Sequence, residues 1–162
     1  MSDRIGVLFV CLGNICRSPL AEAAFRQTVT EAGMADRFEI DSAGISGFHA
    51  GEAPDERMRE VALSRGLRLT GRARQVKAED FQRFDYIIAM DADNLESLQS
   101  LANQSTGDAQ IHLLRSFDPE STDDLDVPDP YYGGRDGFEL VYDLVERACA
   151  GLLDHIRGER GS

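Results

Sequence analysis

Residues 5–19 read IGVLFVCLGNICRSP, and this stretch decides the fold. Its first part, residues 5–10, is a short apolar run rich in β-branched and large side chains, which predicts a buried strand. Ser18 and Pro19 are residue types that favour the N-cap and the first position of a helix, so we expect a helix to begin around Pro19. The chain therefore opens with a strand, a loop and a helix.

The same alternation continues along the chain. Three further apolar runs lie at residues 38–40, 86–90 and 111–114. Helical spacing of apolar residues occupies the intervals, at residues 20–29, 58–62, 95–101 and 138–156, and Gly33 and Gly66 are placed to end the first two helices. Apolar strands alternating with amphipathic helices predict an α/β fold, in which a parallel sheet is covered by helices on both faces. We expect one domain over residues 1–162, with a loosely ordered tail from about residue 157.

The net charge of the chain indicates which classes of partner it is expected not to bind. It has 162 residues with 17 basic and 29 acidic side chains, a net charge of −12. Nucleic acids and anionic membranes are bound through clusters of Lys and Arg, which this sequence lacks, so we expect neither as a partner. The start of the chain lacks the pattern of a secretory signal, and an odd number of cysteines favours a reducing compartment. We expect a cytoplasmic protein.

The loop after the first strand carries the candidate chemistry. In parallel sheets, ligands bind beyond the carboxyl ends of the strands. Gly13 and Asn14 tolerate left-handed backbone, so the loop can curl and direct its N–H groups at an anion on the helix N-terminus. Cys11, facing these amides and Arg17, is expected to be a thiolate nucleophile. Arg17 can grip two phosphate oxygens with its planar guanidinium.

The other cysteines and the histidines are weaker candidates for functional residues. Cys16 has two compatible interpretations: a small packed residue, or a thiol that captures oxidised Cys11 as a disulfide. Cys149 lies on the apolar stripe of the last helix and is expected in the core. The histidines, His49, His112 and His155, are scattered without zinc-site spacing, so we expect no metal and no cofactor.

Displacing a phenol from phosphorus needs an acid that protonates the leaving oxygen. Asp129 is the candidate, because two prolines hold it extended in a turn-forming stretch, residues 127–134, on the side of the sheet where the first loop lies. The adjacent Tyr131 and Tyr132 could stack against a flat substrate.

Taken together, residues 10–19 and residues 129–133 resemble the low-molecular-weight protein tyrosine phosphatase family. The similarity continues through residues 41–44, 73–75 and 84–87, and it covers about residues 5–156. It implies a four-stranded parallel sheet in a flavodoxin-like three-layer sandwich, and metal-free hydrolysis of phosphotyrosine in proteins through a cysteinyl-phosphate. Inorganic phosphate is then the product and an inhibitor.

The resemblance also implies roles for single residues. Cys11 corresponds to the nucleophile, Arg17 to the phosphate clamp and Asp129 to the general acid. Three side chains correspond to those that brace the loop: Asn14, Ser18 and Ser42. The substrate-binding residues are expected to be Leu12, Gly13, Asn14, Ile15, Cys16, Ser18, Phe48, Tyr131 and Tyr132, with Phe48 forming one wall of the cleft opposite the tyrosines.

One departure from the family pattern is Gly71, where the family often has a His behind the loop. We expect a modest effect, because the loop amides and Arg17 act on the sulfur directly.

Three alternatives use the same loop. A thiol-linked arsenate reductase needs two further cysteines on a mobile segment, and residues 91–105 contain none. A protein-arginine phosphatase typically has Thr in place of Ile15. A phosphate-binding module without activity would not need Cys11, Arg17 and Asp129 together.

Overall fold

The computed structural model describes residues 4–131 and 133–160. Within these residues the strands are β1 (Ile5–Cys11), β2 (Phe38–Gly44), β3 (Tyr86–Ala89) and β4 (Gln110–Leu113). The α-helices are α1 (Arg17–Glu31), α2 (Glu56–Ser64), α3 (Asp80–Arg83), α4 (Ala92–Ala102) and α5 (Arg135–Arg160). Two short 3-10 helices, η1 (Ala35–Arg37) and η2 (Leu114–Phe117), precede β2 and follow β4.

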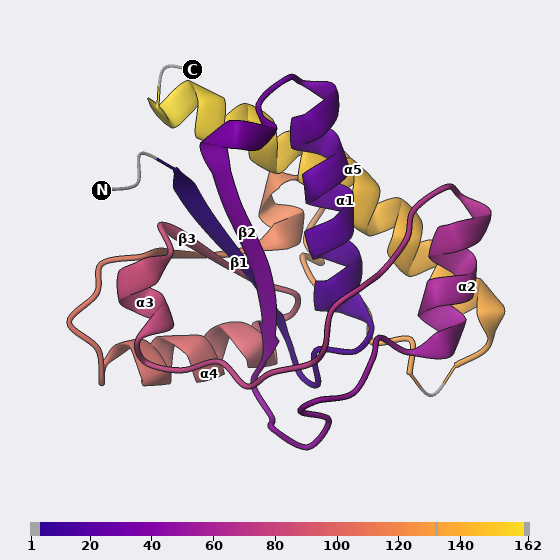
Figure 1. Ribbon diagram of the computed structural model, residues 1–162, viewed down its shortest axis with the longest axis horizontal. Coiled ribbons are helices and arrows are strands. Elements are labelled where there is room, and N and C mark those ends of the chain that lie inside the picture. Colours follow the sequence, from indigo (N-terminus) through magenta and orange to yellow (C-terminus); the bar gives the residue numbers. More distant parts are fainter. Residues whose placement is uncertain (1–3, 132, 161–162) are drawn as a thin grey trace.

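The strands form one parallel sheet in the order β2-β1-β3-β4. Helices α1, α2 and α5 pack against one face, and α3 and α4 against the other (Figure 1). The predicted α/β fold, a four-stranded parallel sheet between two helical layers, is confirmed.

β1 shows why the first apolar run is unbroken. All seven of its residues are buried. Val7 and Phe9 face the core beneath α1 and α5, whereas Leu8 and Val10 face the core beneath α4. A strand covered on both faces cannot alternate apolar with polar side chains, so the run reads as continuous.

The helix ends predicted at Gly33 and Gly66 are confirmed. Both glycines have positive φ, 72° and 84°, just beyond the ends of α1 and α2. The following N–H groups reach back to the last turn: that of Met34 donates to the Val29 carbonyl at 2.8 Å, and that of Leu67 to the Ala62 carbonyl at 2.9 Å. A residue without a Cβ makes this left-handed turn without strain.

Two expectations about boundaries were wrong. β2 does not stop at residue 40, because its pairing with β1 continues to the register pair Cys11 and Gly44. α1 begins at Arg17, with Cys16 as its N-cap, and not around Pro19. Ser18 is therefore inside the helix. Its hydroxyl forms a hydrogen bond with the sulfur of Cys11 and does not cap the helix.

The last helix continues to Arg160, beyond residue 157 where the tail was expected to loosen. None of the helices in the described ranges combines the length and apolar character needed to cross a membrane.

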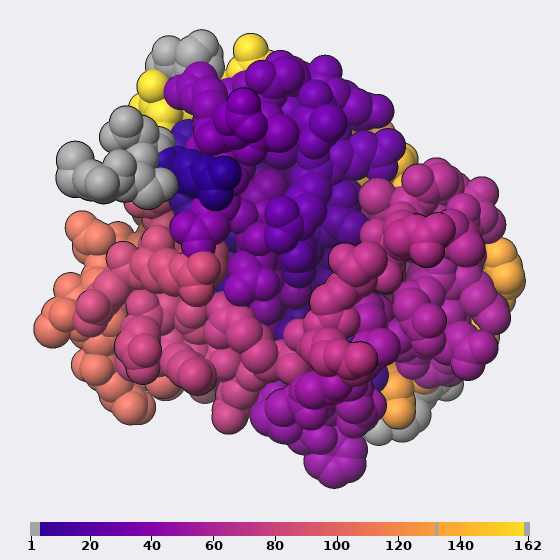
Figure 2. All heavy atoms as spheres, in the orientation of Figure 1, coloured from indigo at the N-terminus to yellow at the C-terminus, as the bar shows by residue number. Residues whose placement is uncertain are grey.

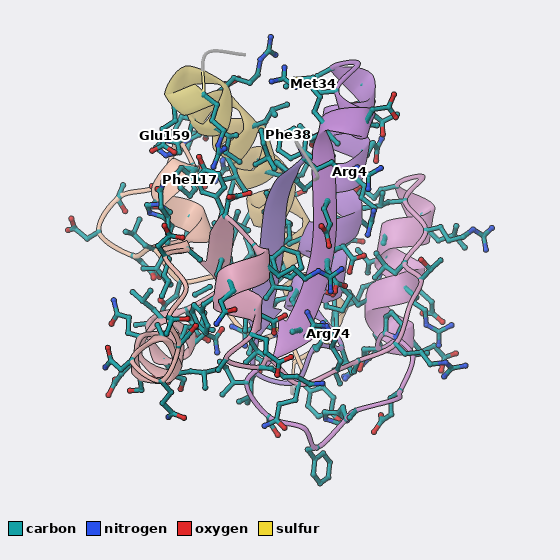
Figure 3. All side chains as sticks on the ribbon, turned by 60° about the vertical axis from the view of Figure 1, so that its left-hand side comes forward. Arg4, Met34, Phe38, Arg74, Phe117 and Glu159 are labelled. Atoms are coloured by element: carbon teal, nitrogen blue, oxygen red, sulfur yellow. The ribbon has the colours of Figure 1, made fainter. Side chains whose placement is uncertain are left out.

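The edge of the sheet formed by the carboxyl ends of its strands carries the loop from Cys11 to Arg17. In Figure 3, Phe38 marks the start of β2, and Arg74 lies toward the opposite edge, beside the carboxyl end of that strand. The segment after β2, residues 45–55, projects from the same edge and is seen in purple at the bottom of Figure 2. The loops that follow β1, β2 and β3 meet there, which is where a parallel sheet places its ligand site.

Candidate active site

The thiol of Cys11 lies at the carboxyl end of β1 and is buried. Its Sγ is 3.0 Å from Ser18 Oγ, and it accepts a hydrogen bond from the Asn14 backbone N–H at 3.3 Å. A hydroxyl and a backbone N–H therefore contact the sulfur directly.

Asn14 holds the curl of the loop. It is the non-glycine residue with positive φ, 58°, in the described part of the chain, a conformation that Asn tolerates better than most residues. Its side-chain amide donates to Ser18 Oγ at 2.8 Å and to Ser42 Oγ at 3.0 Å. Its Oδ1 accepts from the Arg74 backbone N–H at 3.0 Å. The loop geometry is thus fixed by one fully bonded side chain.

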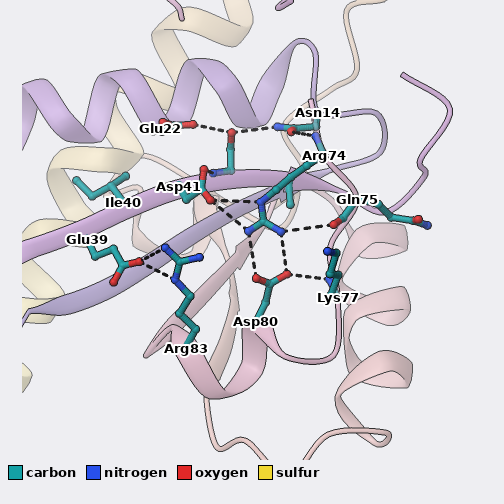
Figure 4. A network of polar contacts seen from close by, with 12 residues as sticks. Asn14, Glu22, Glu39, Ile40, Asp41, Arg74, Gln75, Lys77, Asp80 and Arg83 are labelled. Atoms are coloured by element: carbon teal, nitrogen blue, oxygen red, sulfur yellow. Dashed lines mark hydrogen bonds and ion pairs between the residues drawn. The ribbon is translucent and has the colours of Figure 1, made fainter. Parts of the chain in front are cut away.

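The network continues behind the loop, as Figure 4 shows. The Ser42 hydroxyl donates to Glu22 Oε1 at 2.6 Å, and Arg26 donates to Glu22 Oε2 at 2.8 Å. The Glu22 carboxylate therefore ties α1 to β2.

Arg74 joins the same network from the other side (Figure 4). Its guanidinium pairs with Asp41 at 3.2 Å and with Asp80 at 3.1 Å. Although burial opposes it, the bonds to Asp80 and the charge of Asp41 raise the pKa of Arg74. Arg74 therefore stays charged and fixes the main chain that holds Asn14.

Arg17 lies at the start of α1 and is almost entirely buried. Its Nη1 donates to Asp91 Oδ2 at 2.6 Å and to the Val127 carbonyl at 3.0 Å, and its Nη2 is 3.6 Å from Asp129 Oδ2. Burial works against the charge, but Cys11, Asp91 and Asp129 together raise the pKa of Arg17. A fixed cation thus lies beside the thiol.

Asp129 comes from the segment before α5, and its side chain is 38% exposed. Its Oδ1 accepts the backbone N–H of Tyr131 at 3.1 Å. The carboxyl therefore faces Arg17 from the solvent side of the site.

A cavity of about 370 Å³ joins these groups. It is lined by Cys11, Leu12, Gly13, Ile15, Cys16, Arg17, Ser46, Phe48, His49, Asp129 and Tyr131. Most of the residues predicted to meet substrate are among them, whereas Asn14, Ser18 and Ser42 lie behind the loop. Tyr132 lies outside the described residues. The cavity brings a thiol, a cation and a carboxyl to one place.

The mouth of the cavity is apolar and aromatic. Phe48 is 83% exposed and Leu12 51%. The His49 ring lies between the two walls, 4.9 Å from the Phe48 ring and 6.1 Å from the Tyr131 ring, and its Nδ1 is 3.1 Å from the Glu52 carboxylate. A flat aromatic group suits such a slot.

The remaining cysteines are free and buried. Burial, together with the nearby Asp55 carboxylate, raises the pKa of the Cys16 thiol, so this thiol stays neutral. Cys149 lies in the core as predicted, and its S–H donates to the Ala21 carbonyl at 3.7 Å.

Sequence reasoning missed three residues of this region. Asp91 follows β3 directly and caps α4 by accepting the Asn94 N–H at 2.8 Å, so its place after a buried strand was an available signal. Glu22 could not be found, because its partner lies on β2. His49 carried no signal beyond its type. Among residues 4–131 and 133–160, no group of three His, Cys, Asp or Glu side chains could hold a metal ion.

The site defines a class of protein. A nucleophilic sulfur lies beyond the first strand of a parallel sheet, and a buried guanidinium beside it supplies the planar double donor that phosphate oxygens accept. Cysteine-dependent phosphatases are built in this way.

Comparison with known proteins gives the particular family. The chain belongs to the family described as low molecular weight phosphotyrosine protein phosphatase, whose sequence model matches residues 6–161. A "Low molecular weight protein-tyrosine-phosphatase" of Streptomyces coelicolor is 50% identical over 152 residues, 93% of each chain. The crystal structure of YfkJ from Bacillus subtilis has a TM-score of 0.88 and 46% identity, covering 97% of both chains. That of a Drosophila arginine phosphatase has a TM-score of 0.88 and 36% identity, covering 93% of this chain and 97% of the other.

Proposed function

We propose that this phosphatase hydrolyses phosphotyrosine in proteins through a phosphate ester of Cys11. The observation that carries the proposal is the single cavity in which the Cys11 thiol, the Arg17 guanidinium and the Asp129 carboxyl meet.

In the first step, the Cys11 thiolate attacks the phosphorus atom. An S–P bond forms while the bond from phosphorus to the tyrosine oxygen breaks. Asp129 gives its proton to that oxygen, so tyrosine leaves as a neutral phenol. Arg17 binds two of the phosphate oxygens and stabilises the charge that they carry in the transition state.

In the second step, Asp129, now a carboxylate, takes a proton from a water molecule. The water oxygen attacks phosphorus, the S–P bond breaks, and Cys11 returns to its thiolate. Inorganic phosphate is the product, and because it fits the same loop it is also expected to inhibit competitively.

The role of Ser18 follows from the hydrogen bonds around it. Ser18 Oγ accepts from Asn14, and its own proton faces two acceptors, the Cys11 sulfur at 3.0 Å and the Ala43 carbonyl at 3.3 Å. A thiolate that accepts the hydrogen bond from Ser18 is more stable both before attack and as the leaving group in the second step.

The aromatic mouth supports phosphotyrosine as the substrate. Phe48, His49 and Tyr131 form a slot in which a phenyl ring can lie, and Ile15 makes the inner wall apolar. A phosphoarginine would bring a polar guanidinium against Ile15, at the cost of desolvating it. Phosphoarginine is nevertheless the alternative to test, given the similarity to an arginine phosphatase.

We also propose that the protein works in the cytoplasm. The three cysteines are free thiols, and the mechanism needs Cys11 in that state, which a reducing compartment maintains.

The test is hydrolysis of matched phosphotyrosine and phosphoarginine peptides, and of aryl phosphates, in EDTA. We expect activity on phosphotyrosine and aryl phosphates, none for Cys11→Ser, and weak activity on phosphoarginine. Asp129→Ala should lower kcat/KM by about 10²- to 10⁴-fold on a poor leaving group and much less on a good one. Activity that survives Cys11→Ser, or a preference for phosphoarginine, would overturn the proposal.

A further inference from the structure

Arg57, in the first turn of α2, lies over two aromatic rings, that of Tyr131 in the segment that carries Asp129 and that of Phe138 in α5. Its guanidinium carbon is 5.3 Å from the centre of the Tyr131 ring and 4.7 Å from that of the Phe138 ring. Guanidinium groups within about 6 Å of a ring face are attracted to it. Tyr131 precedes α5 and Phe138 lies within it, so Arg57 contacts both the Asp129 segment and the helix that follows it.

The guanidinium is itself held in place. Asp55 accepts from Arg57 Nε at 3.2 Å and from Nη2 at 3.0 Å, and also from the Arg57 backbone N–H at 2.8 Å. Burial opposes ionisation of Asp55, but these bonds with Arg57 lower its pKa. The two side chains therefore form a stable ion pair at the start of α2.

This pair is joined to the phosphate loop. The Asp55 backbone N–H donates to the Ile15 carbonyl at 2.7 Å. Ile15 lies in the loop between Cys11 and Arg17. Through Asp55, the position of Arg57 is thus fixed relative to the loop that holds the phosphate.

On the other side, the Tyr131 ring is connected to the acid. The Tyr131 backbone N–H donates to Asp129 Oδ1 at 3.1 Å. Asp129 is 38% exposed, and its contact to Arg17 is long, 3.6 Å. Its orientation therefore depends on the main chain at Tyr131, and the ring of Tyr131 rests under Arg57.

We propose that Arg57 is a positioning residue for the general acid: by stacking on Tyr131 while bonded to Asp55, it holds the Asp129 carboxyl in register with the phosphate loop. The inference rests on the proposed function of Asp129. It assigns Arg57 no contact with substrate, and Arg57 is not among the residues that line the cavity.

Arg65 provides a matched control. It directly follows α2, and its guanidinium carbon is 4.5 Å from the centre of the Tyr142 ring of α5. It also pairs with Glu139 at 2.8 Å and with Asp143 at 2.5 Å. Arg65 thus makes the same kind of contact with α5, but none of these partners precedes α5, where Asp129 and Tyr131 lie.

The experiment compares Arg57→Ala, Arg57→Lys and Arg65→Ala with the unsubstituted protein. kcat/KM is measured for phenyl phosphate, a poor leaving group, and for a nitrophenyl phosphate, a good one. The inhibition constant of inorganic phosphate measures separately how well the loop binds phosphate. We measure kcat/KM because it includes the step in which the phenol departs.

We expect Arg57→Ala to lower kcat/KM for phenyl phosphate by about 3- to 30-fold, the equivalent of losing one or two stacking contacts, and to change the nitrophenyl value much less. Phosphate inhibition should stay within about twofold. Arg57→Lys keeps the cation but not the planar group, so its kcat/KM for phenyl phosphate should lie between those of Arg57→Ala and the unsubstituted protein. Arg65→Ala should lower the melting temperature without changing the ratio of the two kcat/KM values.

Two results would overturn the inference. One is an equal loss on both substrates for Arg57→Ala, which would point to a structural or electrostatic role. The other is an undiminished effect of Arg57→Ala in the Asp129→Ala background, where there is no acid left to position. If Asp129→Ala itself shows no dependence on the leaving group, it is the proposed function that fails, and the comparison of these variants separates the two failures.

Discussion

Gly44 lies where β2 ends against the phosphate loop, and replacing it by Ala tests how tightly the fold positions that loop. Gly44 pairs in register with Cys11. A Cβ at Gly44 would lie 3.0 Å from Asn14 N, from Gly13 C and from Leu12 O, all of them main-chain atoms. The strand cannot retreat, because the Gly44 N–H donates to the Arg74 carbonyl at 2.8 Å and the Gly44 carbonyl accepts the Val76 N–H at 2.8 Å. The loop must therefore move by a few tenths of an ångström.

Such a shift should affect both stability and rate. Overpacking of a rigid contact costs about 1–3 kcal/mol, which for a domain of this size lowers the melting temperature by roughly 2–12 °C. Since a displacement of about 1 Å at a catalytic group can cost 10²-fold in rate, a smaller one at Cys11 should lower kcat/KM by roughly 10-fold. Phosphate should bind more weakly by a similar factor, because the same loop holds it.

The assays are thermal unfolding, kcat/KM on an aryl phosphate, and inhibition by phosphate. Gly158→Ala is the control: this position lies inside α5, and a Cβ there meets no atom within 4 Å. It should leave activity unchanged and raise stability by up to about 1 kcal/mol. If Gly44→Ala keeps the melting temperature and kcat/KM of the unsubstituted protein, the rigidity assigned to this contact is wrong.

Two further predictions concern stability. Asp118 is buried, and its hydrogen bonds from Arg147, at 2.7 and 2.9 Å, lower its pKa. Its contribution is therefore present above the unfolded-state pKa of about 4 and lost as the pH falls through the lower folded-state value. Asp118→Asn should cost about 1.5–3 kcal/mol at pH 7 in urea unfolding, and a difference that does not shrink below about pH 4 would contradict this assignment. Gly71 has a φ of +87°, so Gly71→His should lower the unfolding free energy by about 1–2 kcal/mol, with Gly71→Asn losing less. Equal stabilities of the Gly and His proteins in the same assay would show that this backbone strain is absent.

The position of Gly71 also bears on the missing histidine of the family. A Cβ at Gly71 would meet nothing within 4 Å, so space is not what excludes a side chain there; the positive φ is. Behind the loop, the Glu22 carboxylate accepts the Ser42 hydroxyl, and the Arg74 main chain bonds Asn14. The loop is thus supported without an imidazole, and the modest effect of Gly71 stays a prediction.

Much of the fold could be predicted from the sequence because it depends on the types of neighbouring residues. The apolar run of residues 5–10 is continuous because both faces of β1 are buried, and Gly33 and Gly66 end their helices because each must adopt a positive φ. The predicted strand at residues 38–40 was too short, because β2 continues to Gly44. Polar residues Asp41 and Ser42 interrupt the apolar run, but pairing with β1 keeps the strand extended to Gly44.

Residues 118–126, which contain five acidic side chains shortly before Asp129, illustrate the opposite case. These acidic residues look alike in the sequence, yet they have different partners in the structure. Asp118 is buried against Arg147 and Arg115, whereas Asp126 accepts the Ala92 N–H at the start of α4. Composition alone does not distinguish a buried ion pair from a solvated charge, since the difference lies in what the folded chain brings near.

The sequence by itself determined the order of the four strands and the four longer helices, the loop from Cys11 to Arg17 and the candidate acid Asp129, because these depend on residue type and short spacing; it did not predict α3 or the two 3-10 helices. Tertiary structure alone decided which side chains surround the loop and the acid. Asp91 reaches Arg17 across 74 positions, Arg74 reaches Asn14 across 60, and Arg57 of α2 meets Tyr131, which lies just before α5. Contacts of this kind have no local signal, because each partner's position is set by the packing of its own helix or strand on the sheet.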